Sequence, residues 1–205
     1  MIKYIMYTFL LLSTFIGLFM IKLFINAYQW KSEDIRPVQD SCIMLFYPHT
    51  SLLDAICLVT MRMKYKIKIF FLGKNKHYYN KWYSLFYRTL CPNIIATDAK
   101  DTNTDYIVNK LNKEKCYLMI APEGQRKYTK YWKKGFYYIS LNTSLPIIFN
   151  FPCWKKKIVY HSKPIFAKDH SIDEVIEMAR EFYSQYDLTD AVNKDQVGEI
   201  QIKKN

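Results

Sequence analysis

Glycine and proline are scarce in this 205-residue chain, which contains five Gly and seven Pro. Aromatic residues are abundant, with 18 Tyr and 13 Phe, and half of all residues are apolar. This composition excludes an intrinsically disordered chain, because so much apolar surface can be buried in a core. The sequence also lacks internal repeats and low-complexity segments. Its length therefore predicts one globular domain with a short additional segment.

Cysteine and histidine are few, and neither has the spacing of a metal site. The cysteines are odd in number, form no C-x-x-C pair and lie mostly in apolar runs, so a zinc or redox motif is not supported. We expect them to be small core residues in a reducing compartment. These residues are Cys42, Cys57, Cys91, Cys116 and Cys153, with histidines at His49, His77, His161 and His170. We expect no metal and no cofactor.

Acidic residues are outnumbered by basic ones, which leaves a formal net charge of +12. Three kinds of partner fit this charge: a nucleic acid, an anionic membrane surface, or a small phosphorylated substrate. Compositional bias is a further explanation, since Lys, Asn, Tyr and Ile are common throughout the chain. The charge alone does not decide between these explanations.

A long uncharged run, Tyr4 to Ile21, begins near the N-terminus. As a helix it would extend about 27 Å, close to the thickness of the hydrocarbon core of a bilayer. Tyr28 and Trp30 follow at the position of an interfacial aromatic belt. We therefore predict a membrane anchor helix over residues 1–30, with an in-plane helix, a signal peptide or a buried helix as alternatives. The excess of basic residues after the run predicts a cytosolic C-terminal body.

The rest of the chain predicts a linker over 31–41, a domain over 42–190 and a polar C-terminal tail over 191–205. Short apolar runs alternate with helical patterns, which indicates an α/β fold with a mixed, mostly parallel sheet flanked by helices. The expected strands are Cys42–Tyr47, Lys66–Leu72, Ile94–Ala96, Cys116–Ala121, Pro146–Phe151 and Lys156–Tyr160. The expected helices are Leu52–Met63, Lys81–Leu90, Asp105–Asn112, Lys134–Asn142 and Ile172–Tyr186, the last with a capping box at Ser171 and Glu174.

The first candidate catalytic pair is His49 and Asp54, which follow the first expected strand at H-x-x-x-x-D spacing. In one regular helix they would lie about 140° apart and would not meet. They can meet if His49 lies in the loop and Asp54 in the first turn of the next helix. The carboxylate would then orient the imidazole as a general base. A competing interpretation makes Ser51 an N-cap and Asp54 the end of a capping box, with His49 incidental.

A second candidate segment, Pro122 to Lys127, follows the strand expected at Cys116–Ala121. Gly124 would let the main chain approach a substrate, and Arg126 could bind a phosphate through two hydrogen bonds. An ordinary turn between a strand and a helix explains the same pattern.

Lysines and aromatic residues alternate in several places. Lys64, Lys66 and Lys68 predict a strand with one charged face. Lysines also lie among aromatic residues over 127–134 and 154–157. Such clusters suit a membrane interface and equally suit single-stranded nucleic acid, while a solvated lysine-rich face is the simpler explanation.

Taken together, these motifs resemble those of the glycerolipid, lysophosphatidate-type acyltransferases of the phospholipid/glycerol acyltransferase superfamily. The resemblance extends from about Cys42 to Tyr183. The family's successive blocks correspond to these segments: His49–Asp54; Leu72–Lys74 with Ile94–Asp98; Ala121–Lys127; Trp132–Phe136; Leu145–Ile148; and Ser162–Ile165. Four motifs in the right order strengthen the assignment of His49 and Asp54 as functional.

The resemblance implies direct acyl transfer in phospholipid synthesis, with His49 as base and Asp54 orienting it. Acyl-CoA, or acyl carrier protein, would be the donor, and a lysophospholipid such as 1-acyl-glycerol-3-phosphate the acceptor. It further implies that several residues bind substrate: Glu123, Gly124, Arg126, Lys74, Lys100 and Lys133. The expected partners are these substrates and a bilayer, without nucleic acid.

This chain departs from the family pattern at two positions. The arginine of the second block is missing, since Ala99 follows Asp98 and Lys100 is the nearest cation, and Gln125 replaces the usual threonine. Both departures fall where the family binds the phosphate of the acceptor. Alternatives are therefore another lysophospholipid or hydroxyl acceptor, or a basic, membrane-tethered protein that binds lipid or nucleic acid without catalysis.

Overall fold

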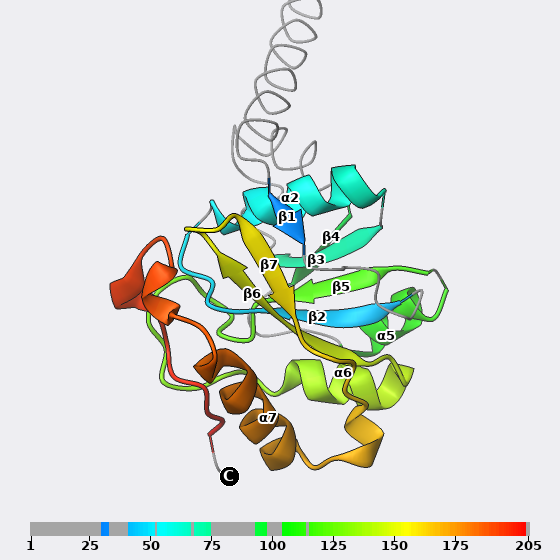
Figure 1. Ribbon diagram of the computed structural model, residues 1–205. Helices are drawn as coiled ribbons and strands as arrows, with labels where there is room; N and C mark the ends of the chain where they lie inside the picture. The colour runs from blue at the N-terminus through cyan, green and yellow to red at the C-terminus, as the bar shows by residue number, and fades with distance from the viewer. Residues whose placement is uncertain are drawn as a thin grey trace, which may run out of the picture.

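A seven-stranded sheet forms the centre of the computed structural model, which describes residues 30–32, 41–51, 53–66, 68–74, 93–97, 104–113 and 115–203. The strand order is β1-β7-β6-β2-β5-β3-β4 (Figure 1). The strands are β1 (Lys31–Ser32), β2 (Cys42–Phe46), β3 (Ile69–Lys74), β4 (Ile94–Thr97), β5 (Tyr117–Ile120), β6 (Ile147–Cys153) and β7 (Ile158–His161). All neighbouring pairs are parallel except β6 and β7. The predicted mixed, mostly parallel sheet is confirmed.

Helices cover both faces of this sheet. They are α2 (Asp54–Tyr65), α5 (Thr104–Leu111), α6 (Gly135–Thr143) and α7 (Ile172–Ser184), with short 3-10 turns η1 (Ala167–Asp169), η2 (Leu188–Asp190) and η3 (Lys194–Gln196). Figure 1 shows α2 on one face and α5, α6 and α7 on the other. The expected helix Lys81–Leu90 lies outside the described residues.

The central strand β2 is buried on both faces, which explains its unbroken apolar sequence. Successive side chains of a strand point to opposite faces, so β2 contributes to two separate cores. Cys42, Met44 and Phe46 belong to the core under α2. Ile43 and Leu45 belong to the core under α6 and α7. The four described cysteines are all buried and free, as expected.

Helix α7 follows its sequence signals closely. Glu174 N donates to Ser171 Oγ, and Ser171 N donates to Glu174 Oε2, so the predicted capping box is present. Its buried side chains recur at helical spacing and face the sheet: Val175, Ile176, Ala179, Phe182 and Tyr183.

The strand predicted for Lys64, Lys66 and Lys68 is wrong in its first half. Helix α2 continues to Tyr65, and Lys66 ends it in a left-handed conformation with φ of 55°. The strand begins only at Ile69. The alternating pattern was too short to outweigh the burial of one face of α2 against the sheet.

Trp30 lies in the core rather than at a membrane interface. Its side chain is 2% exposed, and its ring packs edge-on against Trp154 at a centroid distance of 5.0 Å. The next two residues, which we assigned to the linker, pair with β7 as strand β1. The anchor helix was predicted for residues 1–30, and residues 1–29 lie outside the described residues. Among the residues that are described, no helix is long and apolar enough to cross a membrane.

The C-terminal segment is packed against the domain instead of extending from it as a polar tail. Ile202 forms a parallel bridge with Trp132, and Trp132 N donates to Gln201 O at 2.7 Å. In Figure 1 this orange-to-red segment lies beside the blue-to-cyan loop that joins β2 to α2. The domain therefore continues through residue 203.

Candidate active site

Two loops meet at the carboxyl edge of the sheet. One loop joins β2 to α2 and contains His49, and the other follows β5 and contains Glu123. Strands β2 and β5 are parallel neighbours, with Leu45 opposite Ile120. The two loops consequently begin side by side, at the edge where open α/β sheets bind their ligands.

His49 and Asp54 form a hydrogen-bonded pair. His49 Nδ1 lies 3.2 Å from Asp54 Oδ2. The Asp54 side chain is 1% exposed, whereas that of His49 is 26% exposed. As predicted, the histidine lies in the loop and the aspartate opens the helix.

Asp54 is itself held by main-chain donors. Thr50 N and Ser51 N each donate to Asp54 Oδ2 at 2.8 Å. The competing capping-box interpretation is wrong, because the N-cap residue is Leu53 and no side chain caps the helix there. Ser51 Oγ instead accepts from Leu53 N at 3.1 Å. The buried carboxylate is thus fixed by three donors from its own loop, His49 Nδ1, Thr50 N and Ser51 N.

This geometry sets the tautomer of His49. A carboxylate only accepts hydrogen bonds, so Nδ1 carries the proton and donates a hydrogen bond to Asp54. The Nε2 atom then keeps a free lone pair on a side chain that is partly exposed. His49 is therefore prepared to act as a general base.

Glu123 lies beneath the histidine loop. It is 2% exposed, and its Oε2 accepts from His49 N at 2.9 Å. Burial raises its pKa to about 8, and the charge of Asp54 adds to this, against hydrogen bonds from the main chain of His49 and Gly198. Sequence motifs suggested that Glu123 binds substrate, but its observed contact is with the catalytic loop.

Gly124 adopts a conformation that favours glycine, with φ of 68°. A Cβ here would also lie 2.5 Å from Lys133 Cε, because the Lys133 side chain runs over this residue. Lys133 N donates to Pro122 O at 2.8 Å, which ties the two segments together. Gly124 thus lets an exposed lysine lie against the loop that follows β5.

For the other predicted binding residues, no contact with the His49–Asp54 pair is seen in the described part of the chain. Arg126 is exposed in the turn after Gly124. Lys74 is the last residue of β3, whose neighbour is β5, so its main chain reaches the same edge of the sheet. Lys100, proposed to replace the missing arginine, lies outside the described residues. Within the described part of the chain, no group of His, Cys, Asp and Glu could hold a metal ion.

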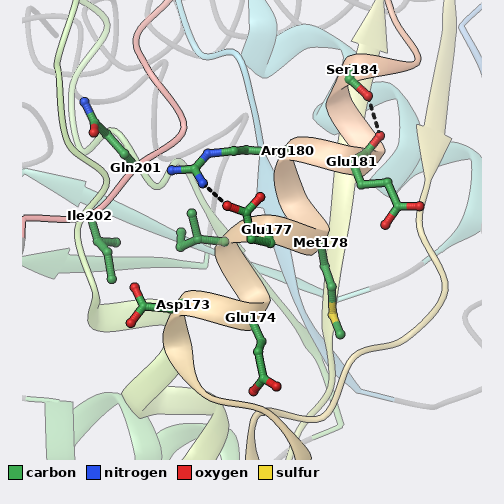
Figure 2. Close-up of a pocket in the computed structure, with 10 residues that line it drawn as sticks. Asp173, Glu174, Glu177, Met178, Arg180, Glu181, Ser184, Gln201 and Ile202 are labelled. Atoms are coloured by element: carbon green, nitrogen blue, oxygen red, sulfur yellow. Dashed lines mark hydrogen bonds and ion pairs between the residues drawn. The ribbon is translucent and has the colours of Figure 1, made fainter.

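A groove of about 890 Å³ lies elsewhere, along α7 and the C-terminal segment (Figure 2). Its lining carries four carboxylates and one guanidinium, from Asp173, Glu174, Glu177, Glu181 and Arg180. The guanidinium is paired with Glu177. No residue of either catalytic loop lines it. An acidic groove is a poor site for an anionic ligand, so the candidate site remains the His49 loop.

The acyltransferase family model matches residues 31–154, which is more than half of the chain and includes both loops. The chain belongs to the acyltransferase family. This is the family of the 1-acylglycerol-3-phosphate acyltransferases, so the resemblance seen in the motifs is confirmed. Membership supports acyl transfer as the reaction and an O-acyltransferase as the class of enzyme. No curated protein matches the chain at a significant level.

Sequence reasoning missed two residues of this acyltransferase that contact the catalytic loop. Asn193 Nδ2 donates to Thr50 O at 2.8 Å, and Gly198 O accepts from Tyr47 OH at 2.7 Å. Both lie beyond the family match, in the segment taken for a tail. No local pattern marks them, because their partners are more than 140 residues away in the chain.

Proposed function

We propose that this protein is a membrane-bound O-acyltransferase that acylates a hydroxyl of a lysophospholipid such as 1-acylglycerol-3-phosphate. The donor is acyl-CoA, with acyl carrier protein as the alternative. The His49–Asp54 pair carries the proposal, because its geometry leaves Nε2 of a partly exposed histidine free to act as a base. The reaction requires such a base and no separate protein nucleophile.

The proposed reaction is a direct transfer. His49 Nε2 removes the proton from the acceptor hydroxyl while the hydroxyl oxygen attacks the carbonyl carbon of the thioester. A new C–O bond forms, and the C–S bond then breaks. The thiolate of CoA leaves with the proton that His49 held, which regenerates the neutral histidine. Asp54 stabilises the imidazolium between these steps.

Cations near the catalytic loop support an anionic acceptor. Lys133 lies against Gly124, and Arg126 is exposed in the same turn. Either side chain suits the phosphate of a lysophosphatidate, Arg126 through paired hydrogen bonds and Lys133 as a point charge. Lys74 and Lys100 are further candidates from the second block, with Lys100 in place of the missing arginine.

The proposed location at a bilayer follows from the substrates. Both acyl chains reside in or at a membrane, and the positive charge of the chain favours an anionic surface. The anchor predicted for the N-terminal segment, up to the buried Trp30, would keep the catalytic body, expected to be cytosolic, at that surface.

The decisive experiment measures CoA release by the full-length protein in membranes, given oleoyl-CoA and lysophosphatidate. We expect His49→Ala to lower the rate by about 10²- to 10⁴-fold, the usual contribution of a general base. His170→Ala, a histidine outside both catalytic loops, is the matched control and should retain wild-type activity.

Release without acceptor would indicate thioester hydrolysis and would require a screen of other lysophospholipids and hydroxyl acceptors. Equal rates for wild type and His49→Ala would refute His49 as the base. Absence of release from folded protein across all acceptors would favour lipid or nucleic-acid binding without catalysis.

A further inference from the structure

The segment after α7 crosses the edge of the sheet that carries the two catalytic loops. We call residues 190–202 the C-terminal strap. At its start, both carboxylate oxygens of Asp190 accept from Lys155 N at 3.0 Å. Near its end, Arg180 Nε donates to Ile200 O at 2.8 Å, and Trp132 N donates to Gln201 O. The strap is therefore fixed at both ends to the body of the domain.

Between these ends, Asn193 contacts the histidine loop. Its side-chain Nδ2 donates to Thr50 O at 2.8 Å, and its main-chain N donates to Thr50 Oγ1 at 3.2 Å. Thr50 is buried, and its own N–H is one of the donors that fix Asp54. A continuous chain of hydrogen bonds thus links Asn193 through Thr50 to Asp54, which holds His49.

Gly198 contacts the strand end and the second loop. Its carbonyl accepts from Tyr47 OH at 2.7 Å. A Cβ at this position would lie 2.4 Å from Thr129 O, so no larger residue fits without movement of the main chain. The close approach brings the strap against the second loop, and the bond from Tyr47 ties it to the residue that precedes Pro48.

Hydrogen bonds also join the strap to the loop that follows Glu123. Tyr128 N donates to Gln196 Oε1 at 3.0 Å, and Tyr128 OH donates to Glu199 Oε1 at 2.6 Å. Glu199 N donates in turn to Thr129 O at 3.1 Å. The His49 loop and the loop after Glu123 therefore both form hydrogen bonds with the strap, which fixes their positions relative to each other.

We propose that the C-terminal strap is a working part of the catalytic site, and that Asn193 is a positioning residue for the His49–Asp54 pair. This inference rests on the proposed role of His49 as base. Without the Asn193 side chain, Thr50 O loses the hydrogen bond from Nδ2. The peptide that carries Thr50 O also carries Ser51 N, which donates to Asp54, so this donor is then held less firmly. Small displacements of a catalytic group of this kind lower turnover more than substrate binding.

The test compares three full-length variants by kinetics and by amide hydrogen exchange. Asn193→Ala removes both polar side-chain atoms, Oδ1 and Nδ2. Asn193→Asp keeps the shape but replaces the donor Nδ2 with an oxygen. Lys194→Ala, an exposed neighbour in the same turn, is the matched control. Asn193 is itself exposed, so its replacement leaves the apolar core intact.

We expect Asn193→Ala and Asn193→Asp each to lower kcat by about 10- to 100-fold with KM for oleoyl-CoA nearly unchanged. The amides of Thr50 and Ser51 should exchange about tenfold faster or more in both variants. Lys194→Ala should match the wild type in both measurements. A loss of kcat in Asn193→Asp as large as that in Asn193→Ala would identify the donated hydrogen bond, rather than packing, as the cause.

Two results would overturn the inference. Wild-type exchange at Thr50 and Ser51 in both Asn193 variants would show that the strap does not hold the loop. Faster exchange with unchanged kcat would show that the contact between Asn193 and Thr50 does not affect turnover. If wild-type activity does not depend on His49, the proposed function fails instead, and amide exchange still measures whether the strap orders the loop.

Discussion

At the scale of single residues, Asp54 is the centre of the site. One oxygen, Oδ2, receives hydrogen bonds from His49 Nδ1, Thr50 N and Ser51 N. A carboxylate that accepts several donors keeps its position as charge develops on the histidine. The short loop thereby builds its own orienting group, with Asp54 buried and the histidine partly exposed.

The environment of Glu123 favours the neutral acid. Its pKa rises from the ordinary value of 4.5 to about 8, mainly through burial. A folded-state pKa above the unfolded one stabilises the fold at low pH, and this contribution is lost as pH rises from about 4.5 through 8. The wild-type enzyme should therefore lose stability over that range because of this group.

Replacement of Glu123 by glutamine should remove that pH dependence. The amide oxygen can still accept from His49 N, and glutamine never ionises. Between pH 5 and pH 8, the stability of Glu123→Gln relative to wild type should rise by about 1 kcal/mol per pH unit. Urea unfolding at several pH values measures this difference. Parallel stability curves for the two proteins would contradict the assignment of Glu123 as the titrating group.

At the scale of elements, two kinds of signal shaped the fold. The apolar runs at β2, β5 and β6 predicted buried strands because a parallel sheet covered on both faces excludes polar side chains. Helix α7 was predicted closely because its capping box and its apolar spacing are both local. The segment at Lys64–Lys68 was misassigned because five alternating residues are compatible with the end of a helix and with a strand.

The cap of α7 offers a direct test at this scale. Ser171→Ala removes the oxygen that accepts from Glu174 N and should lower the free energy of unfolding by about 1 kcal/mol. Activity should be retained, because α7 contributes no residue to either catalytic loop. Ser184→Ala, which affects an exposed bond to Glu181 O at the other end of the helix, should change stability by less than about 0.5 kcal/mol. Equal losses for the two variants would argue against a special role for the cap.

At the scale of the whole molecule, a buried polar network joins distant parts of the fold. Asn150 Nδ2 donates to Leu45 O and Ile148 O, which leaves Asn150 Oδ1 to accept from His161 Nδ1 at 2.5 Å. Tyr183 OH also donates to Leu45 O at 3.2 Å. The network ties β6, β7 and α7 to the end of β2, directly before the catalytic loop.

This network makes global stability sensitive to acid. Burial lowers the pKa of His161 from 6.5 to about 4, so the unfolded chain takes up a proton before the folded protein does. Stability from this group is complete above pH 6.5 and falls as pH drops to about 4, by about 3 kcal/mol in total. Urea unfolding between pH 7 and pH 4 should show a shallower loss for His161→Gln than for wild type. Identical slopes would mean that other groups account for the acid sensitivity.

The sequence by itself determined the α/β class, most strands and helices, and the His49–Asp54 pair, because these depend on residues close in the chain. The histidine and aspartate are five positions apart, and the capping box spans three. Tertiary structure alone decided that Trp30 is buried, that Glu123 faces the main chain of His49, and that Asn193 and Gly198 reach the catalytic loop. Those contacts join segments separated by 74 to 151 residues. Which distant segments meet depends on the order of strands in the sheet, and no local pattern of polar and apolar residues specifies that order.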